Sequence, residues 1–361
     1  MKICLIGTLP DANREAHKGP ERTVIGLAEA LDERGHDVLV VSDEGDAETV
    51  GTPAEVIGED LNPGVDRLLR FYHRVQHEIN LDTFDVVHSW RPAPDVDIFS
   101  IHSINAAETV EQRQPGTFSR RYRLGAKIEM LGKRFTSSNA DRSIVTAIQN
   151  VIDATNNGIE PDRVIPVGVE DSFLQRSESA GEQVQVLCVG RIEQRKNQAF
   201  LAAHTPKTYD LRLVGPSNDE YAKVIPKFEE RWEGKLPAEE LRRSYRTADV
   251  FVLPSIFEGF GLTAAEAMAA ETPVVVADTC GIADHIYDEP IGEVYQYGDP
   301  DSYRRQLERV VERRDEYGRN AHKYVRKNLI WDAIVDQYER EYDRISKGKT
   351  ENDDVDPCKI V

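Results

Sequence analysis

The stretch that decides the fold is ADVFVLPSIFEGFGLTAAEAMAAETPVVVAD, residues 248–278. It opens with an apolar run typical of a buried strand and passes through a loop that contains two glycines. A helical run that we expect from Thr263 to Ala270 follows, and PVVVAD at 273–278 is a second apolar run. A strand, a helix and a strand in this order predict a βαβ unit and therefore a parallel sheet.

The same alternation of strands and helices is predicted in both halves of the chain. In the first half, the strand KICLIG at 2–7 precedes a helical run at 21–34 and the strand DVLVVS at 37–42. In the second half, VQVLCVG at 184–190 opens an equivalent series. Further strands are expected at 85–90, 97–102, 143–147, 163–169 and 211–215. We therefore expect an α/β protein with two doubly wound, Rossmann-like domains, whose strand-end loops face each other across a ligand-binding cleft.

The length of 361 residues, of which 40% are hydrophobic, also fits a globular protein of about two domains. Apolar periodicity is lost near residue 171, and a new strand begins near residue 184. The predicted organisation is a first domain over 1–170, a linker over 171–183, a second domain over 184–326, a helix over 327–345 that packs back on the first domain, and a disordered acidic tail over 346–361.

The charge balance excludes a broad basic surface. Sixty-four acidic against 45 basic residues give a net charge of −19, so a nucleic-acid partner is not expected and any phosphate-binding surface must be local. The acidic surplus resembles proteins of salt-loving organisms, which predicts a halophilic host. No apolar run reaches the roughly 18 to 20 residues of a membrane span, and the N-terminus lacks a signal-peptide layout, so a cytoplasmic location is expected.

The loop within residues 248–278 has the composition of an anion site. Gly259 and Gly261 allow backbone amides to approach a ligand, and a helix begins directly after them. With Ala264 and Asp278, these glycines also fit a dinucleotide fingerprint, which predicts an NAD-dependent oxidoreductase as an alternative. Five residues separate the strand from Gly259, however, whereas the dinucleotide turn is tight.

Two further pairs of side chains lie at this predicted sheet edge. Glu258 and Glu266 bracket the loop, and carboxylates accept hydrogen bonds from vicinal sugar hydroxyls. The alternative is that both are ordinary loop and helix residues. Arg191 and Lys196 follow the strand at 184–190 and could reach one diphosphate, unless they are surface residues of a loop.

Together these motifs resemble the retaining nucleotide-sugar glycosyltransferases of the GT-B fold, in particular glycosyltransferase family 4. The resemblance rests on four segments: KGPERTVIGLAEALDERGHDVLVVS at 18–42, GRIEQRKN at 190–197, PSIFEGFGLTAAEAMAAETPVVVAD at 254–278 and LIWDAIVDQYEREY at 329–342. It implies transfer of a hexose from a UDP- or GDP-sugar to a lipid-linked or saccharide acceptor, with retention of configuration and with neither a metal nor a cofactor.

The resemblance also implies roles for individual residues. Arg191 and Lys196 would bind the donor diphosphate, and Glu266 would hold the ribose. Glu258 would hold the transferred sugar, and the base would lie against Leu236. The loop amides would hold sugar and phosphates, and they belong to Gly259, Phe260, Gly261, Leu262 and Thr263.

In the first half of the chain, the resemblance singles out a histidine and a glycine. His102, at the end of a predicted strand, would stand beside the reacting sugar, although a single histidine is also a common strand-end residue. Gly19 would lie in the first-domain glycine loop. The family usually has paired glycines there, whereas this chain has Lys18, Gly19 and Pro20. A non-catalytic glycosyltransferase-like protein is a further alternative, against which the retention of the motif residues argues.

One basic segment lies apart from these motifs. Residues 113–134 carry seven basic residues and one acid, with Arg120, Arg123, Lys127 and Arg134 on one flank of a predicted helix. An apolar stripe runs beside them at helical spacing, formed by Leu124, Ile128, Leu131 and Phe135. One interpretation is a core helix with a solvated flank. The other is a surface that meets anionic membrane lipid at the inner face of the plasma membrane or a phosphate-bearing lipid acceptor.

Overall fold

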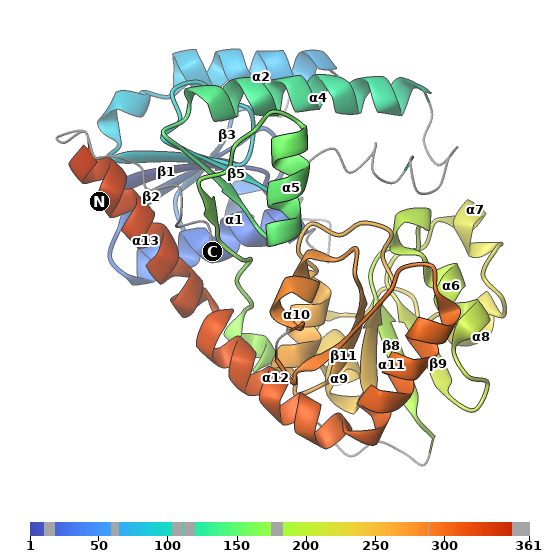
Figure 1. Cartoon of the computed structure of the whole chain (residues 1–361). Coiled ribbons are helices and arrows are strands. Elements are labelled where there is room, and N and C mark those ends of the chain that lie inside the picture. Colours follow the sequence, from blue (N-terminus) through green and yellow to red (C-terminus); the bar gives the residue numbers. More distant parts are fainter. Residues whose placement is uncertain are drawn as a thin grey trace. The chain divides into compact units, whose positions relative to one another are not determined.

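The computed structural model describes residues 1–10, 19–58, 65–102, 111, 120–174, 183–287 and 289–348, which form two compact α/β units (Figure 1). The first unit joins the chain up to Gly168 to the last helix, which begins at Trp331. The second unit spans Val169 to Ile330. Two parallel sheets, one in each unit, confirm the predicted two-domain α/β fold.

The sheet of the first unit has seven parallel strands in the order β3, β2, β1, β4, β5, β6, β7. The bounds are Lys2–Gly7 for β1, Asp37–Ser42 for β2, Ala54–Val56 for β3, Val86–Ser89 for β4, Ile98–Ile101 for β5, Arg142–Val145 for β6 and Arg163–Val164 for β7. Because helices cover both faces, the central strand β1 is a continuous buried apolar run from Ile3 to Ile6.

Each face of this sheet has its own core. Ile3 and Leu5 of β1 belong to the core formed with α1 (Gly19–Glu33) and α13 (Trp331–Gly348). Cys4 and Ile6 point the other way, into the core formed with α2, α4 and α5. Those helices span Val65–Glu78, Arg120–Asn139 and Ile148–Asn156, and α2 and α4 lie side by side in Figure 1.

The second unit contains five parallel strands in the order β12, β11, β10, β8, β9. The strands are β8 (Gln185–Val189), β9 (Asp210–Val214), β10 (Val250–Leu253), β11 (Val274–Ala277) and β12 (Gly292–Tyr295). The helices are α6 (Gln198–His204), α7 (Asp219–Ala222), α8 (Phe228–Arg231), α9 (Ala238–Thr247), α10 (Leu262–Ala269), α11 (Pro300–Glu312) and α12 (Arg314–Asn328). The chain leaves β8 toward β9 on one side and later returns to place β10 on the other side. A ligand crevice is expected where the order reverses, at the carboxyl ends of β8 and β10.

The prediction of a strand over 163–169 was wrong in its length. Only Arg163–Val164 joins the sheet, and Val169 instead pairs with Ile330 in an isolated bridge. Pro166 explains the early end, because proline has no N–H to donate to a neighbouring strand. The strands β3 and β12 and the helix α2 were not predicted from the sequence.

The last helix differs from its predicted bounds at both ends. It begins at Trp331, because 327–328 still belong to α12, and it continues to Gly348, so residues 346–348 are helical rather than part of a tail. It packs on the first unit, as expected, and the rest of the predicted tail lies outside the described residues. Of the predicted linker, Asp171–Phe173 forms a 3-10 turn, and residues 175–182 are not described. In the described part of the chain, no helix combines the length and the hydropathy that a membrane crossing requires.

Trp331 is seated against two glycines of the first unit. A Cβ atom added at Gly26 of α1 would lie 2.2 Å from Cε2 of the indole, and one added at Gly168 would lie 2.3 Å from Cδ2. Neither glycine has a positive φ, so close packing alone excludes a side chain at these positions.

Replacing Gly26 by alanine is therefore expected to lower the free energy of unfolding by about 1–3 kcal/mol through overpacking. Gly125→Ala is the matched control, because Gly125 is also helical but its added Cβ meets nothing within 4 Å. Urea unfolding should show that Gly125→Ala leaves stability unchanged or slightly raised. Equal effects of the two substitutions would contradict this account.

Candidate functional site

The carboxyl ends of β8 and β10 carry the candidate site of the second unit. The loop after β8 runs through Gly190 to the short 3-10 turn Gln194–Lys196, and the loop after β10 runs from Pro254 to Gly261. The amide of Ile256 donates to the carbonyl of Arg195 at 2.8 Å, and the side chain of Asn197 donates to the carbonyl of Pro254 at 3.2 Å. The two loops are therefore fastened to each other at the topological switch point.

Glycine is required where the loops after β8 and β9 approach each other. A Cβ atom at Gly215 would lie 2.1 Å from the carbonyl oxygen of Gly190, and Gly215 also has a φ of +139°. The amide of Gly190 donates to the carbonyl of Val214 at 2.9 Å. This close approach leaves no space for a side chain at position 215.

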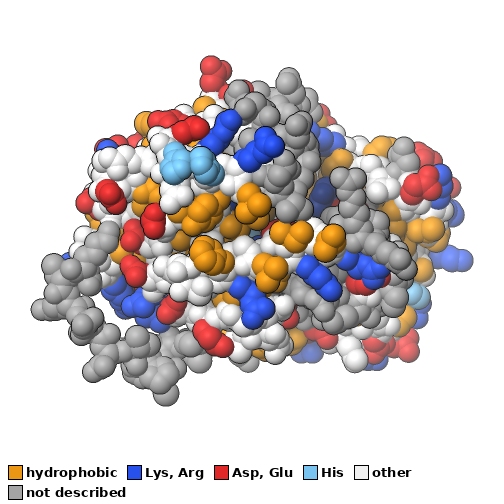
Figure 2. Space-filling model, turned by 90° about the horizontal axis from the view of Figure 1, so that it is seen from above, with side chains coloured by type: hydrophobic (Ala, Val, Ile, Leu, Met, Phe, Trp, Pro, Cys, Tyr) orange, Lys and Arg blue, Asp and Glu red, His pale blue; other side chains and the backbone are white. Residues whose placement is uncertain are grey.

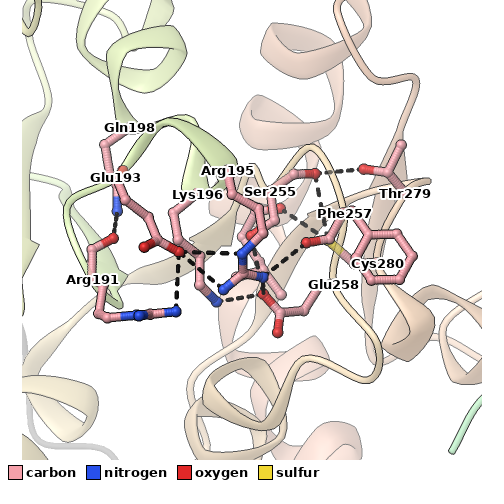
Figure 3. A network of polar contacts seen from close by, with 11 residues as sticks. Arg191, Glu193, Arg195, Lys196, Gln198, Ser255, Phe257, Glu258, Thr279 and Cys280 are labelled. Atoms are coloured by element: carbon pink, nitrogen blue, oxygen red, sulfur yellow. Dashed lines mark hydrogen bonds and ion pairs between the residues drawn. The ribbon is translucent and has the colours of Figure 1, made fainter. Parts of the chain in front are cut away.

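Three donors converge on one carboxylate oxygen in this site (Figure 3). Oε2 of Glu258 forms an ion pair with Nζ of Lys196 and a second one, at 3.3 Å, with Nη1 of Arg195. The hydroxyl of Ser255 donates to the same oxygen at 3.4 Å. The loop glutamate and the lysine that were predicted from the sequence are therefore in direct contact.

A second carboxylate connects the remaining cations. Oε1 of Glu193 lies 3.1 Å from Nη2 of Arg195 and 3.3 Å from Nη2 of Arg191. Arg195 also donates to the carbonyl of Phe257 at 3.1 Å. Three cations against Glu193 and Glu258 leave the cluster with one net positive charge, and the Arg191 side chain is 54% exposed. The cluster is thus suited to receive an anion.

The electrostatics keep Glu258 ionised. Burial would raise the pKa of its carboxyl, but Lys196 and Arg195 outweigh burial and lower this pKa to about 2. The pKa of Arg195 is raised, because the attraction of Glu258 and Glu193 exceeds the opposing effect of burial. At neutral pH Glu258 and Arg195 are therefore both charged.

The glycine loop leads directly into α10. Gly261 has a φ of +109°, and its added Cβ would lie 3.0 Å from both Ile282 and Leu253, so both conformation and packing favour glycine. The carbonyl of Gly261 accepts from the amide of Ala264 at 2.9 Å. The amides of Leu262 and Thr263 stand in the first turn, where a helix offers no internal acceptor and its dipole favours negative charge. Phe260 is buried, with its ring edge-on to His285.

Glu266 and Leu236 lie on elements that flank the cluster. Glu266 is only 1% exposed, and its Oε2 accepts a hydrogen bond of 2.7 Å from the hydroxyl of Tyr245 on α9. Leu236 follows Gly234, whose carbonyl accepts from the amide of Gly215 at 2.7 Å. The segment that contains Leu236 is thereby attached to the carboxyl end of β9. Asp278, the acid of the NAD interpretation, instead accepts from the backbone amide of Tyr297 at 3.0 Å.

His102 and Gly19 belong to the first unit. His102 directly follows β5, and its ring stacks with Trp90 at a centroid distance of 6.3 Å and an interplanar angle of 10°. Its Nε2 is buried and has no hydrogen-bond partner among the described residues. Burial, and secondarily the charge of Lys133, lower the pKa of His102 to about 4, so the ring is neutral at pH 7. Gly19 begins α1, and Lys18 lies outside the described residues.

The other histidine at this sheet edge has a structural role. His88 on β4 is fully buried, and its two ring nitrogens lie 2.7 Å from the hydroxyls of Tyr342 and Ser100. Both nitrogens are therefore satisfied, in contrast to Nε2 of His102.

Several residues that hold the predicted ones in place were not predicted from the sequence: Glu193, Arg195, Ser255, Tyr245 and Trp90. Glu193 and Arg195 stand within the segment 190–197, but no spacing rule shows that a 3-10 turn directs Arg195 toward Glu258. Tyr245 and Trp90 reach their partners only through the tertiary fold. Across the described residues, no group of three or more His, Cys, Asp or Glu side chains is arranged to hold a metal ion.

Two family models match the chain. The model described as "Glycosyl transferases group 1" matches residues 169–328, and the model described as "Glycosyltransferase Family 4" matches residues 17–173. The two matches overlap over residues 169–173, directly after the point where the structure divides into its two units, between Gly168 and Val169.

Relatives and solved structures agree with these matches. A D-inositol 3-phosphate glycosyltransferase of Geodermatophilus obscurus is 26% identical over 292 residues, which cover 70% of this chain and 65% of the relative. The segments aligned with the first two curated relatives cover 54% and 65% of their lengths.

Two solved structures cover nearly the whole chain. A sucrose-phosphate synthase of Thermosynechococcus elongatus has a TM-score of 0.79 at 20% identity and covers 96% of this chain and 99% of its own. The Anabaena protein HepE, solved with UDP and glucose, has a TM-score of 0.69 at 16% identity, with 94% and 98% covered. At these identities the likeness shows a shared fold.

The ionised state of Glu258 makes a prediction about stability and pH. Because its pKa is about 2 in the folded protein against an ordinary 4.5, Glu258 stabilises the fold above pH 4.5, and this contribution is lost as pH falls toward 2. Glu258→Gln should therefore be less stable than the wild type by a few kcal/mol at pH 7, since each pKa unit corresponds to about 1.4 kcal/mol. Urea unfolding at pH 7, 4.5 and 3 should show the difference shrinking below pH 4.5.

The control for this experiment is Glu220→Gln, which removes an exposed ion pair with Lys223. Exposed pairs contribute about 0–1 kcal/mol, so its effect should be small at every pH. A Glu258→Gln difference that is absent at pH 7, or that grows as pH falls, would refute the charge assignment.

Proposed function

We propose that this chain, which belongs to the group 1 glycosyltransferases and has the GT-B fold, transfers a hexose from a nucleoside diphosphate sugar to a lipid-linked or saccharide acceptor. The observation that carries the proposal is the positively charged cluster beside the N-terminus of α10, at the switch point of the second sheet. Such a place binds phosphates in open parallel sheets.

The donor diphosphate is assigned to Arg191, Lys196 and the first amides of α10. Arg191 is exposed and offers a guanidinium fork, whereas Lys196, whose side chain is 12% exposed, offers a point charge. The ammonium group has three protons, so Lys196 can keep its bond to Glu258 while it donates to a phosphate. The complex of HepE with UDP supports a uridine donor, and a guanosine donor is the alternative.

Glu258 is assigned to the transferred sugar. The ion pairs and the hydrogen bond that fix its carboxylate all converge on Oε2 in the described part of the chain. Oε1 can then accept hydrogen bonds from sugar hydroxyls without disturbing the cluster. Glu266 is assigned to the ribose, with Tyr245 as the side chain that sets its orientation.

The chemistry follows from the charge that the reaction creates. Breaking the anomeric C–O bond yields an oxocarbenium-like centre and a diphosphate leaving group, and Arg191, Lys196 and the helix amides would stabilise the leaving negative charge. No metal is needed for this role in our proposal. We propose retention by front-face displacement, in which the leaving phosphate takes the proton of the acceptor hydroxyl.

His102 is assigned to the acceptor side of the same reaction. A neutral imidazole can donate a hydrogen bond to a sugar hydroxyl or direct its dipole at the developing positive charge without adding a repulsive cation. Its low pKa and its unpartnered Nε2 support this role. We expect the imidazole to contribute to kcat rather than to donor affinity, because it acts on the reacting carbon.

The proposal predicts which ligands stabilise the protein and which substitutions abolish turnover. UDP or GDP should raise the melting temperature, and NAD should not. In a mass-spectrometric screen of UDP- and GDP-sugars for hydrolysis or transfer, His102→Ala, Lys196→Ala and Glu266→Ala should each reduce turnover about 100-fold or more. Lys223→Ala is the control, because Lys223 is an exposed cation outside the cluster.

If NAD raised the melting temperature and neither UDP nor GDP did, the proposed donor class would be wrong and the NAD-dependent oxidoreductase would be favoured. Near-wild-type turnover of any one of the three variants would remove that residue from the mechanism. No turnover of any donor, despite binding of UDP or GDP, would favour the non-catalytic alternative.

A further inference from the structure

The apolar stripe of α4 faces outward. Leu124, Leu131 and Phe135 lie on one face of the helix, and together with Leu69 of α2 they are between 58% and 68% exposed. The side of α4 that packs inward instead carries Met130 and Thr136, which are buried. The interpretation of the segment 113–134 as a core helix with a solvated flank was therefore wrong about the apolar stripe, although Met130 of α4 does belong to the core.

The exposed side chains form one surface across two helices. Tyr72 of α2 lies edge-on to Phe135 of α4 at a centroid distance of 6.5 Å. A Cβ atom added at Gly132 would lie 3.4 Å from Leu68, so α2 and α4 are in direct contact there. The α2–α4 patch is defined here as Leu69, Leu124, Leu131 and Phe135. Figure 2, which views this side of the molecule, shows hydrophobic side chains gathered near the middle of the face, with Lys, Arg and His side chains next to them.

An exposed apolar patch of this kind is expected to bind another molecule or a membrane. Single exposed leucines are common on soluble proteins, but several large apolar side chains on two adjoining helices mark a surface that meets a partner or a membrane. The helices themselves are held by Phe71, Val75 and Met130 in the core beneath them, so the patch is not needed to attach them.

The charges beside the patch identify the chemistry of the occupant. Arg123, Lys127 and Arg134 stand on one flank of α4, at spacings of four and seven residues. Glu129, the single acid of this helix, is paired with Lys133 at 2.8 Å. In a chain with a net charge of −19, this flank is a local concentration of positive charge. The partner must therefore be both apolar and anionic.

We infer that the α2–α4 patch docks onto an anionic lipid bilayer, with its apolar side chains at the acyl boundary and its basic flank among the phosphate headgroups. An apolar face flanked by Lys and Arg is the arrangement of helices that lie in the plane of a membrane interface. A second copy of the chain is a poorer fit, because its own patch would contribute another basic flank rather than anionic groups. The cytoplasmic leaflet carries the anionic lipids, so the inner face of the plasma membrane is the site this surface fits.

This inference goes beyond the sugar-transfer proposal and does not rest on it. The patch belongs to the first unit, whereas the cationic cluster that we assign to the donor belongs to the second. Binding to vesicles requires neither a nucleotide sugar nor an acceptor, so failure of one proposal is recognisable without the other.

The test measures co-sedimentation of the full chain with two kinds of vesicle, at the lowest KCl concentration at which circular dichroism shows the protein folded. One kind is pure phosphatidylcholine, and the other contains phosphatidylcholine with about a third phosphatidylglycerol. The wild type should partition onto the anionic vesicles at least tenfold more strongly than onto the neutral ones.

Two variants separate the apolar contribution from the charged one. Leu69→Ser/Leu131→Ser/Phe135→Ser should weaken binding to anionic vesicles at least tenfold, because the inserted apolar area is lost. Arg123→Gln/Lys127→Gln/Arg134→Gln should remove the preference for anionic over neutral vesicles, at roughly fivefold per charge. The control is Val224→Ser/Tyr287→Ser, which removes two similarly exposed apolar side chains from the second unit and should bind like the wild type.

The melting temperature of each variant confirms that it is folded, and the charge variant keeps the test informative if the apolar variant fails to fold. Absence of wild-type binding to anionic vesicles would overturn the inference. Wild-type binding by both the apolar and the charge variants would also overturn it. A wild type that instead dimerises through this patch, with dimerisation lost in the apolar variant, would identify a second copy as the occupant.

Discussion

The contact between Lys196 and Glu258 is the interaction on which the candidate site depends. It fastens the loop after β8 to the loop after β10 at the point where the order of the second sheet reverses. An enclosed ion pair is weak evidence for stability, because the desolvation of both charges offsets much of their attraction. The ion pair instead serves to position side chains. The Glu258 carboxylate holds Lys196 and Arg195 in place, and one net positive charge remains in the cluster for an anionic ligand. Removing Glu258 would take the carboxylate partner from Lys196, whereas removing Lys196 would leave Glu258 paired with Arg195.

In the first unit, the constraint is the burial of polar side chains near the ends of the strands. Its sheet is covered on both faces, so the side chains near the strand ends must either find partners or be kept neutral. His88 finds Tyr342 and Ser100, whereas His102 is neutral but retains an unpartnered nitrogen among the described residues. An unsatisfied buried polar atom costs free energy, and such costs are typically tolerated where a ligand supplies the missing bond. The two histidines therefore differ in their hydrogen bonding, which their sequence positions alone do not show.

Much of the fold could be predicted from the sequence, because parallel strands buried on both faces are recognisable apolar runs, as at Lys2–Gly7 and Val274–Ala277. The predicted strand at 163–169 failed because Pro166 and the packing of Gly168 against Trp331 interrupt the ladder. The orientation of α4 could not be predicted, since helical spacing shows that its apolar residues share a face but not whether that face points inward. In the site, the proximity of Lys196 and Glu258 followed from strand-end reasoning. Arg195 and Tyr245 did not, because a 3-10 turn and a contact between α9 and α10 place them.

The central claim is that the cationic cluster of the second unit recognises a diphosphate. Isothermal titration calorimetry tests it most directly, with UDP against UMP and GDP against GMP, on the wild type and on Lys196→Met. We expect one diphosphate to bind the wild type at least tenfold more tightly than its monophosphate, and we expect this advantage to disappear in Lys196→Met. Equal affinities for diphosphate and monophosphate in the wild type, or an advantage that survives the loss of Lys196, would contradict it.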